Sequence, residues 1–198
     1  MLIQTDTNVN NGRRLTPEAS RAAAVDAARA LLIEEGPGAV TLKAVAARVG
    51  KTHANILHHF GSAAGLQRAL AEDISARVIA GIGEAVEAAW RGDADERLIV
   101  DRTFAAFERE GGGALASWMI LTGETGSLAP ILHAIHDLVR RLGEGKPGHP
   151  VREHTLGLVL LALGNSLLGR PMAEALDLPA DAARELGLKL LRGSSKAA

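Results

Sequence analysis

The spacing of apolar residues constrains this chain most, because along nearly its whole length they recur at intervals of three and four positions. That interval is the period of an α-helix with one buried face. No segment shows several strict alternations of apolar and polar residues, which is the pattern of a half-buried strand. Alanine, the strongest helix former, is also the commonest residue. The sequence therefore predicts an all-α protein.

Length and composition limit the class of protein further. A chain of 198 residues with 47% hydrophobic and 23% charged residues can bury a core, and its length suits one or two domains. The absence of cysteine excludes a disulfide scaffold, an iron–sulfur cluster, a thiolate zinc site and a cysteine nucleophile. We expect a globular protein that needs no metal and no cofactor.

The longest apolar stretch, Gly157 to Gly169, is about 13 residues long and contains Asn165. A spanning helix needs about 20 apolar residues. The polar N-terminus also lacks the apolar core of a signal peptide. We therefore expect a cytoplasmic protein with no membrane partner.

Helix boundaries are marked by hydroxyl residues that can cap the free N–H groups of a first turn, and by glycines that end helices. Thr16, Thr41, Thr52 and Ser62 stand at four such starts. The predicted helices run from Thr16 to Glu35, Leu42 to Val49, His53 to Phe60, Ala63 to Trp90, Asp95 to Glu110, Ala114 to Thr122, Leu128 to Leu142, Val151 to Gly169 and Pro179 to Arg192.

Positive charge is concentrated near the front of the chain, although the formal net charge is only −1. Between Thr41 and Leu66, three cations (Lys43, Arg48 and Lys51) occur without any acidic residue. A local basic patch of this kind favours a polyanionic partner. An ordinary solvated face is the alternative interpretation.

Two short helices joined by a glycine turn form the pattern of a helix-turn-helix in this same segment. Ala46 is small enough to face a crossing helix, and Gly50, four positions later, tolerates left-handed backbone geometry. The apolar Ile56 follows six positions on, and Val45 and Val49 complete the packing. The second helix of the pair then exposes its polar side.

The segment TLKAVAARVGKTHANILHHFGSAAGL, residues 41–66, resembles the DNA-binding region of TetR-family transcriptional repressors. With the preceding helix, the resemblance covers about 50 residues, from Thr16 to Leu66. It implies a flexible arm (1–15), a three-helix helix-turn-helix domain (16–62) that binds a double-stranded DNA operator, and a C-terminal helical bundle (63–198) for ligand binding and dimerisation.

Helix geometry assigns roles within this region. Thr41 and Thr52 precede helix N-termini, whose unpaired N–H groups attract phosphate. Polar side chains on the exposed side of the second helix can reach base edges. The predicted DNA-binding residues are Arg13, Arg14, Thr41, Lys43, Lys51, Thr52, His53, Asn55, His58 and His59, with Arg48 adding charge.

Two positions depart from the family pattern. Leu57 stands where the family usually has Tyr, and Ala63 stands where it usually has Lys. Both family residues normally contact phosphate. Because Leu57 and Ala63 cannot, we expect DNA binding that is weaker or more sensitive to salt.

The C-terminal region carries more apolar surface than one buried face requires. One stripe consists of Leu156, Val159, Leu160, Leu163 and Leu167, and a second consists of Leu158, Leu161 and Leu168. With Leu186, Leu190 and Leu191 on the last helix, the surplus predicts a homodimer. A central helix buried on all sides by its own chain is the alternative.

Bulky and titratable residues of the C-terminal region are candidates for a pocket that holds a small, mainly apolar effector. These candidates are Phe104, Phe107, Trp118, Met119, His133 and His136. His133 and His136 are three positions apart and could also ligate one metal, but no further ligand stands at a recognisable spacing. A solvated helix surface is the simpler interpretation of the pair.

The sequence thus favours a ligand-responsive regulator, a repressor that a small molecule releases from its operator. A His-dependent enzyme is a second hypothesis, for which the chain offers only His133 and His136, since it has no nucleophile elbow, HExxH motif or phosphate loop. A third hypothesis is a helical dimeric interaction protein that has lost DNA binding, which Leu57 and Ala63 keep open.

Overall fold

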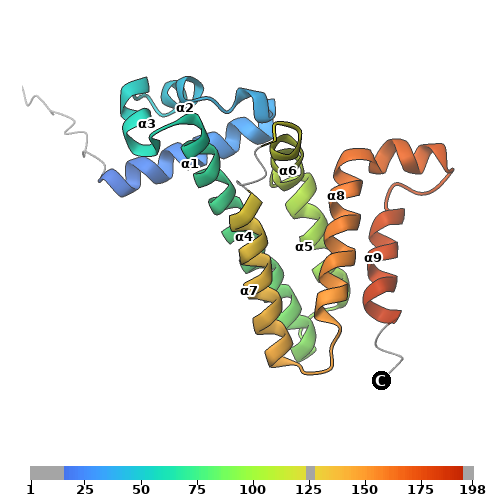
Figure 1. The fold of residues 1–198 in the computed structure, drawn as a ribbon. Helices are drawn as coiled ribbons and strands as arrows, with labels where there is room; N and C mark the ends of the chain where they lie inside the picture. Colours follow the sequence, from blue (N-terminus) through green and yellow to red (C-terminus); the bar gives the residue numbers. More distant parts are fainter. Residues whose placement is uncertain (1–15, 124–127, 194–198) are drawn as a thin grey trace, which may run out of the picture.

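A computed structural model describes residues 16–123 and 128–193, and within these ranges the regular structure is helical with no strand (Figure 1). This confirms the predicted all-α class. The elements are α1 (Pro17–Glu35), η1 (Pro37–Ala39), α2 (Leu42–Arg48), α3 (His53–Phe60), α4 (Ala63–Arg91), α5 (Glu96–Glu108), α6 (Gly112–Leu121), α7 (Ala129–Gly145), α8 (Val151–Ala175) and α9 (Ala182–Gly193).

The four predicted hydroxyl caps are present at the starts of α1, α2, α3 and α4. Thr16, Thr41, Thr52 and Ser62 each accept a hydrogen bond from the backbone N–H three residues later, at 3.0 to 3.2 Å. Each bond satisfies one of the free donors in a helix's first turn. The predicted first residues of α2, α3 and α4 are confirmed, and Thr16 is the cap that precedes α1.

Helices α1, α2 and α3 form a compact head, and α4 runs from it down into the rest of the molecule (Figure 1). The core of the head includes Leu32, Val45 and Ile56, and it continues along α4 to Ile74. Leu115 and Met119 of α6 belong to the same core. The predicted boundary between residues 62 and 63 thus falls inside one continuous core.

The remaining helices pack around the lower part of α4. One core joins Ala85 of α4 to Val100 and Phe104 of α5, Leu158 of α8 and Leu188 of α9. Another lies where α7 and the start of α8 meet α4, around the buried side chains of Leu138, Leu142 and Val151. This lower bundle forms the walls of the cavity described below.

Glycines allow α9 to approach its neighbours closely. A Cβ atom on Gly157 of α8 would lie 2.4 Å from Leu190 Cδ2, and one on Gly187 of α9 would lie 3.0 Å from Leu158 Cδ2. The first contact is shorter than packed Cβ atoms show, and the second is tighter than most of them. Ion pairs between Arg97 and Glu185 at 2.6 Å, and between Arg192 and Asp95 at 2.9 Å, add to the attachment of α9 to α5.

The predicted end of the eighth helix at Gly169 is wrong, because α8 continues to Ala175 with Pro171 inside it. Proline lacks the N–H that would bond the preceding turn, so it bends a helix without always ending it. Figure 1 shows the last turns of α8 running across the direction of its first part. Similarly, α7 extends to Gly145 and α9 begins at Ala182, each about three residues from the predicted limit.

At 25 residues, α8 is long and apolar enough to cross a membrane by length and composition alone. Such a helix also occurs in the core of proteins that meet no membrane. Only 17% of its most apolar window is buried in this chain, so α8 is not a central helix enclosed by its own chain. That alternative from the sequence is therefore wrong.

Candidate nucleic-acid interface and ligand cavity

The turn between α2 and α3 has the geometry that the glycine predicts. Gly50 adopts φ +65°, in the left-handed region, and the next N–H, of Lys51, donates to the carbonyl of Ala46 at 2.9 Å. Ile56 is completely buried beneath α3. Together these contacts fix the orientation of α3 on α2 and leave its other side to solvent.

The outer side of α3 presents His53, Leu57 and His58, all exposed. His59 is half-buried, with its ring centroid 6.4 Å from that of Phe60. Asn55 is also half-buried, and its Oδ1 is enclosed without a hydrogen-bond partner in the described part of the chain. A bidentate contact with adenine needs that oxygen, so in this conformation Asn55 does not offer the predicted contact.

Lys43 and Lys51 are exposed, and among the described residues no carboxylate lies within ion-pair distance of either. Arg48 differs, because its guanidinium contacts Glu34 at 2.5 Å and Glu35 at 3.9 Å. The hydrogen bond to Glu34 raises the pKa of Arg48 further. In this structure the charge of Arg48 ties α2 to the end of α1, and its contribution to DNA binding stays a prediction.

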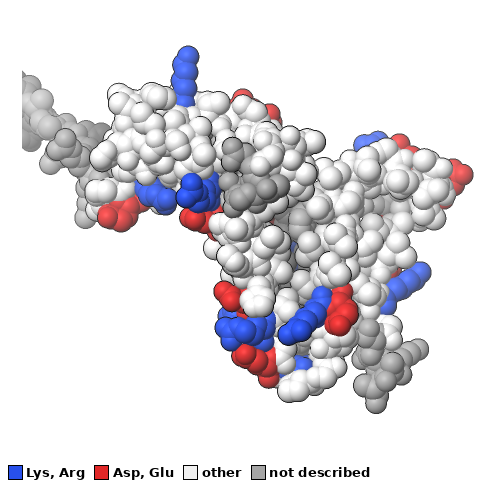
Figure 2. All heavy atoms as spheres, in the orientation of Figure 1, with Lys and Arg blue, Asp and Glu red and all other residues white. Residues whose placement is uncertain are grey.

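Acidic side chains are sparse over α2 and α3 in the view of Figure 2, where a cationic side chain projects outward. In the sequence, no Asp or Glu occurs from Gly36 to Ala71.

Arg68, in the second turn of α4, is an exposed cation that the sequence analysis did not single out. Its position within this acid-free run was the available signal. The predicted arm residues Arg13 and Arg14 lie outside the described residues.

Thr41 and Thr52 combine capping with a possible phosphate contact. Their hydroxyl oxygens accept hydrogen bonds from the N–H groups of Ala44 and Asn55. A hydroxyl that accepts through a lone pair keeps its own proton for donation. Both side chains are exposed, so this proton is available to a phosphate oxygen.

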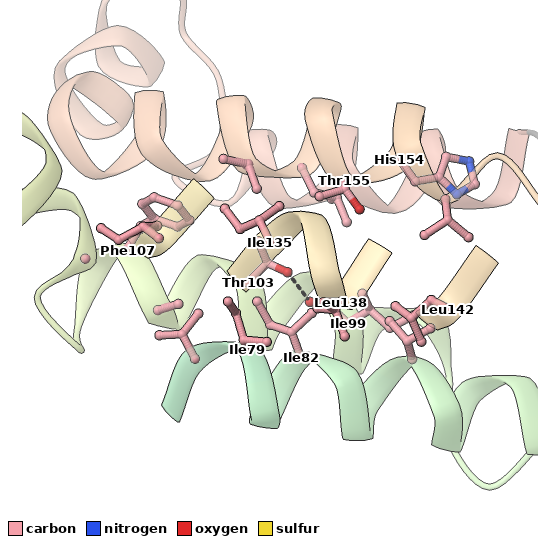
Figure 3. Close-up of a pocket in the computed structure, with 18 of the residues that line it drawn as sticks. Ile79, Ile82, Ile99, Thr103, Phe107, Ile135, Leu138, Leu142, His154 and Thr155 are labelled. Carbon is pink, nitrogen blue, oxygen red and sulfur yellow. Dashed lines mark hydrogen bonds between the residues drawn. The ribbon is translucent and has the colours of Figure 1, made fainter. Parts of the chain in front are cut away.

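A cavity of about 400 Å³ lies between α4, α5, α6, α7 and α8. Figure 3 shows Ile79 and Ile82 on one side of it, with Thr155 and His154 on the other. Most of the lining is branched aliphatic. The hydroxyls of Ser75 and Thr103 donate to backbone carbonyls of their own helices, at 2.6 and 2.8 Å. They are thus already partnered, and the central part of the cavity is apolar.

Of the six predicted ligand-binding residues, Phe107 alone lines this cavity. Phe104 is completely buried in the lower core, where Arg184 lies 4.8 Å from its ring centroid. Met119 and Trp118 pack in the core that α6 shares with the head.

The two predicted histidines also lie outside the cavity, for a different reason. His133 and His136 are exposed on α7, while Ile131, Ile135 and Leu138 of that helix line the cavity. The apolar stripe of α7 turns inward and carries the histidines to the outer side. Within the described residues, no cluster of three metal-ligating side chains includes them.

Polar groups gather at the end of the cavity near Trp90. Lys146 Nζ lies 5.3 Å from the Trp90 ring centroid, and the His149 ring meets the same indole edge-on at 5.8 Å. His154 and Thr155 line this end from α8. Burial, aided by the neighbouring His149, lowers the pKa of His154, while Glu153 opposes the shift.

Helix α6 contributes to both the cavity and the head. Ala116 and Ile120 line the cavity, Met119 lies in the head's core, and Leu115 does both. At the helix start, Gly111 has φ +87°, and a Cβ atom there would lie 2.8 Å from Leu32 Cδ2 of α1. A displacement of α6 would therefore be felt in α1.

The surface of α8, the segment after it and α9, hereafter the leucine face, carries large apolar side chains that are about half or more exposed. They are Leu156, Leu160, Leu167, Leu168, Met172, Leu176, Leu178 and Leu186. Residues of the two predicted stripes have different surroundings in the structure. Leu158 is buried, and Val159 and Leu163 line the cavity.

The protein-family model described as bacterial regulatory proteins, tetR family, matches residues 24–70. The matched segment includes most of α1, all of α2 and α3, and the first two turns of α4. No curated protein matches the chain.

Proposed function

We propose, from the premise that this chain is a TetR-family DNA-binding transcriptional regulator, that it is a repressor which a small, mainly apolar molecule releases from its operator. This family is not one of enzymes, so the His-dependent enzyme is set aside. One observation carries the proposal: α6 borders the cavity with one side and packs into the core of the DNA-binding head with the other.

On DNA, α3 enters the major groove with His53, Leu57 and His58 toward the base edges. Lys43 and Lys51 contact phosphates on either side of the groove, assisted by the hydroxyls of Thr41 and Thr52. Arg68 supplies a phosphate contact near the start of α4. This contact partly replaces that of the lysine that the family usually has at the position of Ala63. With so few cations, the binding depends strongly on salt.

The functional unit is a homodimer formed through the leucine face. Eight large apolar side chains exposed to water are unfavourable in a monomer, and a two-fold axis would cover the same side chains on both copies. The two α3 helices of such a dimer reach successive major grooves, which are about 34 Å apart along the duplex.

The ligand acts by changing that separation. Helix α4 connects the head to the lower bundle covalently, and α6 adds a packed contact through Leu115 and Gly111. A molecule that binds the cavity more tightly when α4 and α6 have shifted favours the shifted state. In that state the two α3 helices no longer match the groove spacing, and the operator is released.

The residues divide accordingly into an arm (1–15), a head (16–62) and a ligand-binding and dimerisation region (63–198), with the core of the head extending into the third part. The protein acts in the cytoplasm, where its operator is accessible, and requires no membrane. The role proposed for the leucine face is self-association.

The test begins with selection of a duplex from a random library by the full chain. Operator affinity is then measured by fluorescence anisotropy at fixed salt, with and without dodecanol or dodecanoate. We expect a selected sequence with two half-sites and a loss of affinity of at least several-fold when the cavity is filled. If no duplex is enriched, the chain is a dimeric interaction protein instead. If either probe binds and affinity is unchanged, the release mechanism is wrong for that probe.

A further inference from the structure

The two ends of the cavity differ in chemistry, and the difference specifies the ligand more closely. Phe107 marks one end and His154 the other (Figure 3). Between Ile131 and Leu142, which both line the cavity, α7 advances about 16 Å. The space is therefore elongated, with an apolar middle and polar groups at the Trp90 end.

The cation that lines the polar end of the cavity is Lys146. Lys146 is half-exposed, and in the part of the chain that the structure describes it has no carboxylate within ion-pair distance. Glu96 also lines the cavity, but Arg192 Nε of α9 lies 3.8 Å from its Oε2. Among the described residues that line the cavity, Glu96 is the one carboxylate, and Arg192, which it shares with Asp95, lies within ion-pair distance of it, whereas Lys146 has no such partner.

Neutral donors surround this cation. The His154 ring and the Thr155 hydroxyl line the cavity from α8, and His149 lies beside them on the edge of Trp90. Imidazole and hydroxyl groups can each donate a hydrogen bond to an anion. A lysine together with such donors is a suitable site for a carboxylate, because hydrogen bonds to charged groups are the stronger ones.

We propose that the effector is an amphipathic molecule with a carboxylate head held by Lys146, His154 and Thr155, and a hydrocarbon tail that runs toward Phe107 and α6. The inference rests on the proposed ligand response and adds the chemical class of the ligand. It also gives the tail a function, since α6 residues Ala116 and Ile120 line the cavity. A tail too short to reach α6 binds without releasing DNA.

The test compares three probes that share one tail and differ in head charge: dodecanoate, dodecanol and dodecyltrimethylammonium. Each is titrated into the full-length protein by calorimetry below the concentration at which it forms micelles. We expect dodecanoate to bind about three- to tenfold more tightly than dodecanol, and the cationic probe to bind most weakly. Equal or reversed affinities would overturn the carboxylate head.

Two variants locate the head group. Lys146→Gln should remove the preference for dodecanoate over dodecanol, and Lys146→Glu should favour the cationic probe. Lys189→Gln, which changes an exposed lysine of α9 outside the cavity, serves as the matched control and should leave the order of affinities unchanged. If Lys146→Gln weakens all three probes alike, the lysine acts through folding and the assignment is wrong.

Operator binding separates this inference from the proposed function. Dodecanoate that binds through Lys146 but leaves operator affinity unchanged would refute the release mechanism and retain the ligand class. Release by dodecanol or the cationic probe in preference to dodecanoate would retain the release mechanism and refute the carboxylate ligand. Hexanoate, with the same head and a shorter tail, should compete with dodecanoate and release little DNA; equal release at saturation would refute the role of the tail.

Discussion

The head and the leucine face differ in how many large apolar side chains they expose to solvent. From α1 to α3, Ile33 and Leu57 are the large apolar residues that remain exposed among the described ones, and the surface around α3 is polar or cationic. On α8, the segment that follows it and α9, many leucines are 49 to 63% exposed. The first arrangement suits a hydrated, charged partner such as DNA, and the second suits the more apolar interface of a homodimer.

A charge placed on the leucine face should produce the largest effect. In Leu160→Lys, dimerisation would bury two unpaired ammonium groups, which costs several kcal/mol and should shift the protein to monomer at micromolar concentration. Sedimentation velocity measures this directly. Leu121→Lys, at a leucine that is 84% exposed at the end of α6, is the control and should remain dimeric. A dimer that survives Leu160→Lys would place the interface elsewhere.

Removing cations from the head should have the next largest effect. Lys43→Gln and Lys51→Gln should each weaken operator binding several-fold at physiological salt, and should lower the slope of log affinity against log salt by about two per dimer. Arg48→Gln is the informative contrast, because Arg48 already pairs with Glu34 and Glu35. That variant should leave the salt slope unchanged. Equal slopes for Lys43→Gln and wild type would remove Lys43 from the interface.

The contact between α6 and the head can be tested at Gly111. Gly111→Ala places a side chain at φ +87° and against Leu32, whereas Gly92→Ala has a similar φ of +80° with open space around it. Both should lose about 1 kcal/mol of unfolding free energy from backbone strain, and Gly111→Ala should lose about 1 kcal/mol more. Urea unfolding of both variants gives the difference. If the two variants lose the same unfolding free energy, Leu32 of α1 moves aside without cost, and the proposed coupling between α6 and α1 is contradicted.

The smallest effect concerns His154. Because burial lowers its pKa in the folded protein, the unfolded chain binds the proton more tightly, and stability should rise with pH through the region of the ordinary histidine pKa. The neighbouring charged or titratable groups are His149, which strengthens the shift, Glu153, which opposes it, and Lys146 at the same end of the cavity. Urea midpoints at pH 5.5 and 7.5 should differ less in His154→Gln than in wild type.

An exposed histidine provides the control for this pH effect. His133→Gln on α7 should retain the wild-type difference between the two pH values. If His154→Gln also retains it, another group is responsible for the dependence.

The head could be predicted in detail because short-range chemistry determines it. Thr41 and Thr52 cap the helices that follow them, and Gly50 supplies the one left-handed residue of the turn. The failures there involve side-chain partners that are distant in sequence. Arg48 is paired with Glu34, fourteen residues earlier, and Asn55 has its Oδ1 enclosed by packing. Neither contact has a local signal.

The lower bundle was less predictable because its helices have more than one apolar side. Ile79 and Ile82 of α4 line the cavity, but nothing in the periodicity of α4 alone shows which of its sides faces a space and which faces a neighbour. The histidines of α7 were assigned by residue type rather than by their position on that helix. The apolar stripe of Ile131, Ile135 and Leu138 indicates the side of α7 that faces the cavity, and the two histidines lie on the other side.

The central claim is that the head binds DNA only when the leucine face has joined two chains. Mass photometry of the selected duplex with the full-length protein counts the chains on each operator. The account predicts two chains on a duplex with two half-sites, and no stable complex for Leu160→Lys at the same concentration. A single wild-type chain bound to the duplex, or a Leu160→Lys monomer that binds with wild-type affinity, would contradict it.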